Sequence, residues 1–290
     1  MFDHAGLTAL SAIIVHGSFD AAAQALGLTQ SAVSQRIRAL EERVGSPALV
    51  RGTPCTPTAI GLRLYRHAEE VARLEATLTT DLGAASTAPL SVRIATNADS
   101  LATWLLPALA GIDEILFDLV VDDQDHSADL LRRGEVAAAI TGRGAPVQGC
   151  DAHPLGALRY IATASPEFAQ RWFPDGPTSQ ALTAAPALVF NEKDRLQASW
   201  AANAAGQPVS LPRHRLPSTT AFVEAAELGL GWGMNPEPLV RQALKDGRLV
   251  ALSDVPLDTP LFWQVSRVGA GALLPLTRSV KAAAKGALVT

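Results

Sequence analysis

The sequence predicts an α/β protein in which a small helical N-terminal domain and one long helix precede a larger domain of alternating strands and helices. A chain of 290 residues is long enough for about two domains. With 48% hydrophobic residues it can form real cores, so it is globular rather than disordered. Apolar residues recur at helical spacing up to Leu82, and short strand-like runs alternate with helical ones after Pro89.

Residues 18–45 predict two helices joined by a tight turn. Ser18 is a suitable N-cap for the first helix, Gly27 ends it, and Thr29 is a suitable N-cap for the second. The second helix has one apolar stripe that can dock and one polar stripe that is free to contact a partner. Gln and Arg side chains pair with base edges in the DNA major groove, and Ser and Arg hold phosphates. The apolar stripe is Val33, Ile37, Leu40 and Val44, and the polar stripe is Ser31, Ser34, Gln35 and Arg38.

The segment that follows predicts a β-wing. Residues 49–51 form a short strand, residues 52–57 form a turn and a returning segment, and Thr58 opens the next helix. Arg51 would lie where a wing can touch the DNA backbone or minor groove. Any two amphipathic helices joined at a glycine resemble a helix-turn-helix, so the wing strengthens the interpretation as a DNA-binding domain.

These residues together resemble the winged helix-turn-helix of LysR-type transcriptional regulators, over the segment 18–45, the wing and the closing run 56–61. Ser31 stands where that family often has proline, and Ile60 stands where it often has a polar or small residue. The resemblance implies a DNA-binding domain over residues 1–61 that binds a double-stranded operator. The expected DNA-contacting residues are Ser18, Gln30, Ser31, Ser34, Gln35, Arg38 and Arg51.

One long helix is predicted from Thr58 to about Leu82, and its apolar stripe needs a partner. The resemblance implies that two such helices pair antiparallel in a homo-oligomer, either a dimer or a dimer of dimers. An ordinary helix packed on its own domain is the alternative. We expect this linker helix and a hinge over residues 58–86. The stripe consists of Leu64, Ala68, Val71, Leu74, Leu78 and Leu82.

The βαβ order of the remaining chain predicts a mainly parallel sheet with helices on both faces. The resemblance implies a two-subdomain effector-binding domain over 89–290, similar to periplasmic binding proteins. Subdomain I is expected over about 89–160 and 266–290, and subdomain II over about 161–265. The expected strands are 90–95, 115–121, 136–141, 160–164, 187–190, 215–216, 230–234, 249–252 and 261–266, and the expected helices are 101–109, 127–133 and 275–288.

Polar loops at strand ends predict a small-molecule site in the cleft between the subdomains. Residues 97–100 and 217–220 each open a helix and offer backbone N–H groups and hydroxyls, which suit a carboxylate. Residues 122–126 bring negative charge to the same cleft, and negative charge favours a cation. A basic amino acid carries both groups, so it is the effector that the loops predict.

Two other interpretations of the acidic loop stay open. Asp125 or Ser127 can simply cap the next helix while the other side chains are solvated. Metal binding by Asp123, Asp125 and His126 is the other, but nothing else supplies a matching ligand set. We therefore expect no metal and no other cofactor.

Five further runs, 97–104, 122–136, 146–150, 229–233 and 258–264, resemble the LysG/ArgP branch of the family. The resemblance implies a regulator that senses lysine or arginine and controls a target such as an amino acid exporter gene, with RNA polymerase as a further candidate partner. A LysR-type regulator of other genes with a different small carboxylate effector is the alternative. The expected effector-binding residues are Ser100 and Thr219 for the α-carboxylate, Asp123 and Asp99 for cationic groups, Thr141 and Trp232 for the shape of the cleft, and Asn97 and Ser218 beside them.

Composition restricts the remaining classes of protein. The net charge of −4 hides a small local excess of arginine in the first domain, so we expect several such domains to bind DNA together. Two distant cysteines indicate neither a disulfide framework nor a zinc site, and no signal segment or membrane span is expected, which favours a cytoplasmic protein. An enzyme is not expected, because no recognised nucleophile motif accompanies Ser100, His126, His153 or His214. A solute-binding transporter component would leave the segment 18–45 without a purpose.

Overall fold

The computed structural model describes residues 3–83, 89–123 and 127–290. Contacts within the chain divide it into two units, one formed by Met1–Val92 with Val268–Ala272 and the other by Arg93–Arg267 with Leu273–Thr290. Part of the expected hinge, and Asp125 and His126 of the expected acidic loop, lie outside the described residues.

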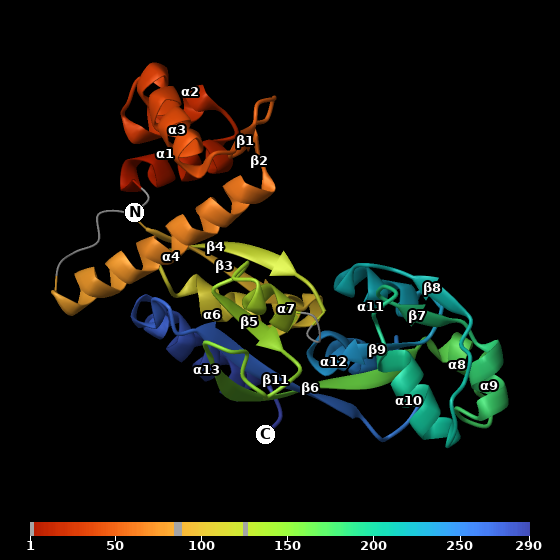
Figure 1. Ribbon diagram of the computed structural model, residues 1–290. Helices are drawn as coiled ribbons and strands as arrows, with labels where there is room; N and C mark the ends of the chain where they lie inside the picture. Colours follow the sequence, from red (N-terminus) through yellow and green to blue (C-terminus); the bar gives the residue numbers. More distant parts are fainter. Residues whose placement is uncertain (1–2, 84–88, 124–126) are drawn as a thin grey trace. The chain divides into compact units, whose positions relative to one another are not determined.

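Three helices open the first unit (Figure 1). Ser18 Oγ accepts a hydrogen bond from the Ala21 N–H at 3.1 Å, and Thr29 Oγ1 accepts one from the Ala32 N–H at 3.2 Å, so both expected N-caps are confirmed. Gly27 ends the second helix with a φ of 64°, a left-handed conformation that glycine adopts without strain. The helices are α1 (His4–His16), α2 (Phe19–Leu26) and α3 (Gln30–Val44).

The apolar stripe of α3 docks as expected. Val33, Ile37 and Leu40 are buried in a core that they share with Leu10 and Ile13 of α1. Burying one such aliphatic side chain contributes about 1.5–3 kcal/mol to stability. The helix is therefore held on one side, and its polar side is left to solvent.

A short hairpin forms the expected wing. Strands β1 (Leu49–Val50) and β2 (Thr56–Pro57) pair antiparallel. Glu41 of α3 ties the hairpin to the helices, because its Oε1 accepts hydrogen bonds from the Ala48 N–H at 2.8 Å and the Leu49 N–H at 3.3 Å.

The long helix α4 (Ala59–Asp81) follows the wing, close to its expected bounds. Its first turn is capped by Thr58, whose Oγ1 accepts from the Gly61 N–H at 3.0 Å. Leu64 is buried in the core of the winged domain, whereas Leu74 and Leu78 are 50% and 58% exposed. In the second half of the apolar stripe, these leucines are thus exposed rather than covered by other residues of the chain.

The second unit is built on a seven-stranded sheet with the strand order β10-β6-β11-β5-β3-β4, and β9 also pairs with β6 (Figure 1). Two long strands, β6 and β11, run through both halves of this unit and pair from Leu257 opposite Tyr160 to Ser266 opposite Cys150. The strands are β3 (Leu90–Thr96), β4 (Ile115–Val121), β5 (Ala138–Thr141), β6 (Cys150–Ala164), β9 (Gly233–Pro236), β10 (Val250–Ala251) and β11 (Leu257–Ser266).

The expectation of a mainly parallel sheet is wrong. β3 and β5 pair parallel, but β11 is antiparallel to β5 and β6, and β9 and β10 are antiparallel to β6. The reason is the path of the chain. It leaves the first half of the unit on β6 and returns on β11, so these two strands must run in opposite directions where they pair.

The two halves of this unit are called here the first lobe, which contains β3, β4 and β5, and the second lobe, which contains β7, β8 and β9. Each has its own apolar cluster, one around Leu131 and Ala139 and the other around Leu188 and Phe222. The remaining elements are α7 (Ser127–Arg132), α8 (Pro166–Trp172), α9 (Ser179–Ala184), β7 (Ala187–Val189), α10 (Leu196–Ala205), β8 (Arg213–Arg215), α11 (Thr219–Glu227), α12 (Glu237–Lys245), the 3-10 helix η2 (Ala270–Leu273) and α13 (Leu274–Ala287).

Some predicted elements differ in their bounds. The helix expected at 101–109 starts at Ala98 and consists of α5 (Ala98–Ser100), a π-helical turn η1 (Leu101–Leu105) and α6 (Leu106–Ala110). β6 and β11 begin well before the expected strands 160–164 and 261–266, because long-range pairing between them extends both.

No single helix in the described part of the chain is long and apolar enough to cross a membrane. Helices α1 and α2 meet the length and composition criteria only as a pair, with a bend of 120° between them.

Candidate functional site

A cavity of about 420 Å³ lies in the second unit, where strand ends of the first lobe meet loops and helix starts of the second. A volume of this size suits a small molecule such as an amino acid. Its polar and charged lining residues are Asn97, Asp99, Asp122, Asp123, Asn191, Lys193, Asp194, Arg195, Gln197, Ser199, Thr219, Asn235, Asp258 and Thr259.

Asp99 joins three elements around this cavity. It lies in α5, directly after β3, and accepts hydrogen bonds from Tyr160 Oη of β6 at 2.7 Å and from Thr219 Oγ1 of α11 at 2.9 Å. Burial raises the pKa of Asp99, and the nearby carboxylates of Asp194 and Asp123 raise it further, against the two hydrogen bonds that lower it.

Asp194 is the second buried carboxylate of the cavity. It follows β7, and its oxygens accept from the backbone N–H groups of Phe190 at 2.8 Å and Leu196 at 3.0 Å. Burial raises its pKa in spite of these hydrogen bonds, and the charge of Asp123 adds to the increase.

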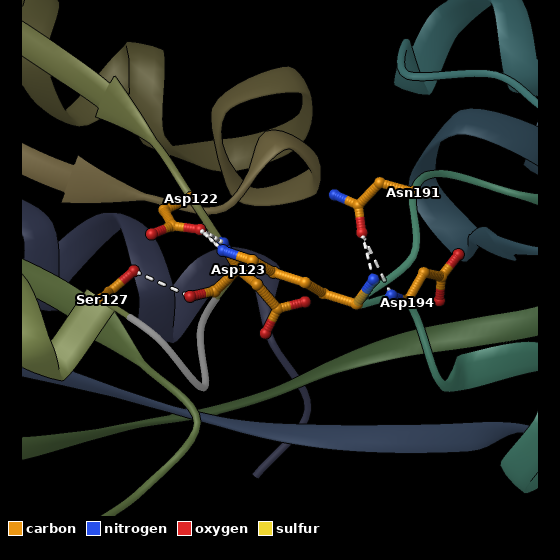
Figure 2. Close-up of polar contacts among 6 residues, drawn as sticks. Asp122, Asp123, Ser127, Asn191 and Asp194 are labelled. Atoms are coloured by element: carbon orange, nitrogen blue, oxygen red, sulfur yellow. Dashed lines mark hydrogen bonds and ion pairs between the residues drawn. The ribbon is translucent and has the colours of Figure 1, made fainter.

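The end of β4 supplies the adjacent pair Asp122 and Asp123 (Figure 2). Asp122 Oδ1 accepts from the Asp123 N–H at 2.8 Å and from Lys193 Nζ at 2.9 Å. The backbone carbonyl of Asp123 accepts from Ser127 Oγ at 3.1 Å. Figure 2 shows the Asp123 carboxylate extending toward the loop that carries Asn191 and Asp194.

This arrangement favours a cationic ligand. The charge of Asp123 raises the pKa of both Asp99 and Asp194, and the charge of Asp194 raises the pKa of Asp99 further, because each negative charge opposes ionisation of a nearby carboxyl. A ligand ammonium or guanidinium would relieve that repulsion with charge-assisted hydrogen bonds. The described residues contain no group of three His, Cys, Asp or Glu side chains arranged to hold a metal ion.

The structure brings four of the expected effector residues to the cavity and leaves four away from its lining. Asn97, Asp99, Asp123 and Thr219 line it. The other four are Ser100, fully buried in α5; Ser218, an exposed N-cap of α11; Thr141, buried and accepting a hydrogen bond from Gln264 Nε2 at 3.1 Å; and Trp232, packed edge-on against Phe173 in the core of the second lobe.

Sequence reasoning missed Asp194, Lys193, Gln197 and Asn235 among the lining residues. Gln197 and Asn235 are fully buried, and the side-chain oxygen of each has no hydrogen-bond partner among the described residues. Such orphaned acceptors are expected to face a ligand or water that donates to them. The charged run 191–195 after an expected strand was a signal for two of these residues, whereas nothing local marked Gln197 and Asn235.

The helix α3 presents the expected DNA-contacting face in the other unit. Gln30, Gln35 and Arg38 are exposed on it. Ser31 is also exposed, and its hydroxyl shares a hydrogen bond of 3.0 Å with Thr29, whereas Ser34 is half-buried.

Two further expected DNA contacts also make contacts within the protein. Ser18 caps α2. The guanidinium carbon of Arg51 lies 5.4 Å from the ring centroid of Phe19, which stacks the wing arginine on α2 and leaves its side chain exposed.

Comparisons with known proteins agree across both units. Residues 89–282 match the LysR substrate binding domain, and residues 5–62 match the bacterial regulatory helix-turn-helix protein of the lysR family. The chain is 44% identical over 281 residues to the HTH-type transcriptional regulator LysG of Mycobacterium bovis, covering 97% of this chain and 93% of that one. It is 46% identical over 282 residues to the HTH-type transcriptional regulator ArgP of Pseudomonas fluorescens, covering 95% and 94%.

Solved structures give the same result. The crystal structure of ArgP from Mycobacterium tuberculosis aligns with a TM-score of 0.78 and 43% identity, over 98% of each chain. Full-length LysG from Corynebacterium glutamicum with bound effector Arg aligns with a TM-score of 0.68 and 35% identity, over 99% of this chain and 100% of that one.

Removing either side-chain hydrogen bond to Asp99 should lower the free energy of unfolding by an amount that depends on pH. Tyr160→Phe deletes a donor to a buried carboxylate, so we expect the free energy of unfolding to fall by about 1–3 kcal/mol at pH values well above the raised pKa of Asp99. The change raises the pKa of Asp99 further, so the loss is present where Asp99 is ionised and shrinks as the pH falls through that pKa. Urea unfolding at several pH values measures it. Thr219→Val, which removes the other donor, should behave in the same way, and a loss that does not change with pH would contradict the assignment.

Proposed function

The chain belongs to the LysR family of DNA-binding transcriptional regulators, and from this premise we propose that its effector domain senses a basic amino acid, lysine or arginine. The observation that carries the proposal is the group of carboxylates of Asp99, Asp123 and Asp194 around one cavity of about 420 Å³. The relative LysG from Corynebacterium glutamicum, solved with bound effector Arg, supports it. The target that we propose is an exporter gene for the sensed amino acid.

Different lining residues of the cavity would hold the two ends of such a ligand. We assign the cationic groups of the ligand to Asp123, Asp194 and Asp99. We assign the α-carboxylate to the backbone N–H at Thr219, because helix N-termini such as that of α11 favour anions and the Thr219 hydroxyl already donates to Asp99. The buried carbonyl oxygens of Gln197 and Asn235 would accept hydrogen bonds from ligand N–H groups. Ser100, Ser218, Thr141 and Trp232 receive no direct contact in this assignment, because they do not line the cavity.

Binding of the effector would alter DNA binding by changing the spacing between the DNA-binding domains of several copies of the chain. The exposed leucines of α4 support antiparallel pairing of two linker helices, and two such dimers would form a tetramer. A ligand that closes the lobes would change this spacing, and a coupling of about 1–3 kcal/mol is sufficient for regulation. We propose that the protein works in the cytoplasm, where its operator lies, with RNA polymerase as its further partner.

On the operator, α3 would lie in the major groove. Gln30, Ser31, Ser34 and Gln35 would read base edges, and Arg38 and Arg51 would contact phosphates or the minor groove. Ser18, at the N-terminus of α2, would contact the DNA backbone through its backbone N–H, since its hydroxyl is used as a cap.

The first test concerns the cation site. Asp123→Asn removes a charge from the cavity, so we expect the affinity for lysine and arginine to fall by about tenfold or more in isothermal titration calorimetry. Binding of the ligand-free protein to its operator should not change. The matched control is Asp113→Asn, an exposed position outside the cavity that loses the same charge. Unchanged affinity in Asp123→Asn would remove Asp123 from the site.

The second test uses pH. The pKa values of Asp99 and Asp194 are raised above 3.8 in the ligand-free cavity, and a cationic ligand favours their ionised forms, so binding should release protons. We therefore expect arginine affinity to fall as the pH is lowered toward the raised pKa values of Asp99 and Asp194. Calorimetry in buffers of different ionisation enthalpy measures the released protons. Asp194→Asn should bind more weakly and lose part of this pH dependence, whereas a pH-independent affinity of the unchanged protein would contradict the acidic cluster as the cation site.

The third test concerns DNA. Gln35→Ala should relax base preference at one operator position by about 1–3 kcal/mol, because a base-edge contact is lost. Arg38→Ala should weaken binding to all sequences and lower the salt slope by about one, as expected for a phosphate contact. A gel-shift series over operator variants and salt concentrations separates the two effects. Arg278→Ala, an exposed position on α13, is the control for loss of one positive charge. If both changes in α3 left operator binding intact, the proposed orientation of this helix would be wrong.

A further inference from the structure

The acidic cavity already holds a cation that belongs to the protein. Lys193 lies on the loop after β7 in the second lobe, and its Nζ is 2.9 Å from Asp122 Oδ1 at the end of β4 in the first lobe. Both residues line the cavity. The ion pair therefore joins the two lobes at the cavity, and Figure 2 shows the labelled Asp122 on one side and the loop with Asn191 and Asp194 on the other.

Both ends of this ion pair are held in place by the backbone. Asn191 Oδ1 accepts from the N–H groups of Lys193 at 2.8 Å and Asp194 at 3.1 Å, which fixes the loop as an Asx turn. Asp122 donates its N–H to the carbonyl of Thr96, the last residue of β3, at 3.0 Å. The four-carbon side chain of Lys193, which has many rotatable bonds, connects these two anchored ends.

The charges around the cavity explain why the lysine reaches across it. Among the described residues, five carboxylates, including Asp122, Asp123 and Asp194, and two cations, Lys193 and Arg195, line the cavity. One of the five, Asp258, is paired at 2.8 Å with Arg159, which does not line the cavity. In the absence of a ligand, the Lys193 ammonium reduces the repulsion in this cluster. The ion pair is 47% exposed on the lysine side and 27% on the aspartate side, so solvent screens it and a ligand can replace it at modest cost.

We propose that Lys193 is a tethered counter-cation, which the side-chain cation of the effector displaces from the acidic cluster when it binds. This inference rests on the proposed sensing of a basic amino acid. Displacement by the effector makes Lys193 a specificity-determining residue. A ligand with a charged side chain restores the charge balance that is lost when the lysine leaves, whereas a neutral ligand cannot.

The opposite role is that Lys193 binds the α-carboxylate of the effector. The two roles predict changes of opposite sign when the lysine is removed. Loss of a competitor strengthens the binding of lysine and arginine, whereas loss of a carboxylate ligand weakens the binding of every amino acid.

The experiment is calorimetry on the full chain with L-arginine, L-lysine and L-citrulline, the last a neutral analogue of arginine. We expect Lys193→Met to bind arginine and lysine about three- to tenfold more tightly and to leave citrulline binding unchanged. The control is Lys245→Met, at an exposed position at the end of α12 in the same lobe, which loses the same charge outside the cavity. Weaker or unchanged arginine binding in Lys193→Met, or an equal gain in Lys245→Met, would overturn the inference.

Two further variants identify the partner of Lys193. Lys193→Arg keeps the cation and should stay within about twofold of the unchanged protein. In an Asp122→Asn background, the gain from Lys193→Met should fall below about twofold, because the lysine is no longer held across the cavity. A full gain in that background would overturn the inference. If the unchanged protein binds neither lysine nor arginine, the proposed function itself fails. If the unchanged protein binds arginine but Lys193→Met shows no increase in affinity, only the inference about Lys193 fails.

Discussion

The burial of Asp99 is the constraint on which the rest of the effector domain depends. A buried carboxylate is costly unless donors satisfy it, and its donors are hydroxyls from Tyr160 on β6 and Thr219 on α11. These three side chains come from distant parts of the chain, so the hydrogen bonds fix the start of α5, the crossing strand β6 and the start of α11 together. The walls of the cavity are formed by the same elements.

The side chains around Asp99 carry an excess of negative charge, and the proposed function follows from this excess. Asp123 and Asp194 add negative charge beside it, and the backbone donors of Asp194 do not offset its burial. An arrangement that served only stability would place a cation or an apolar group here. The tethered cation Lys193 compensates in part and stays exchangeable, which is the property that a sensor of positively charged ligands requires.

The DNA-binding unit depends on a different kind of interaction. The ends of its helices are determined by N-cap and C-cap residues, and their packing by apolar residues three or four positions apart. Glu41 fixes the wing to α3. Residues 1–66 carry six arginines against four carboxylates, a small excess of positive charge, so one copy would hold an operator weakly. Regulation can then reside in how paired α4 helices space several copies, and the leucines exposed on α4 are consistent with that pairing.

The sequence by itself determined whatever depends on neighbours along the chain. Ser18, Gly27 and Thr29 could be assigned as caps because a cap bonds its own first or last turn. The family motif and the acidic loop were also visible in the sequence, and they indicated DNA and a cationic ligand. Only the tertiary structure decided which polar residues meet: it brought Asp194 and Asn235 to the cavity and placed Trp232 in an apolar core. It also made the sheet largely antiparallel, because β6 and β11 pair across a whole lobe of intervening chain, and local periodicity carries no information about such pairing.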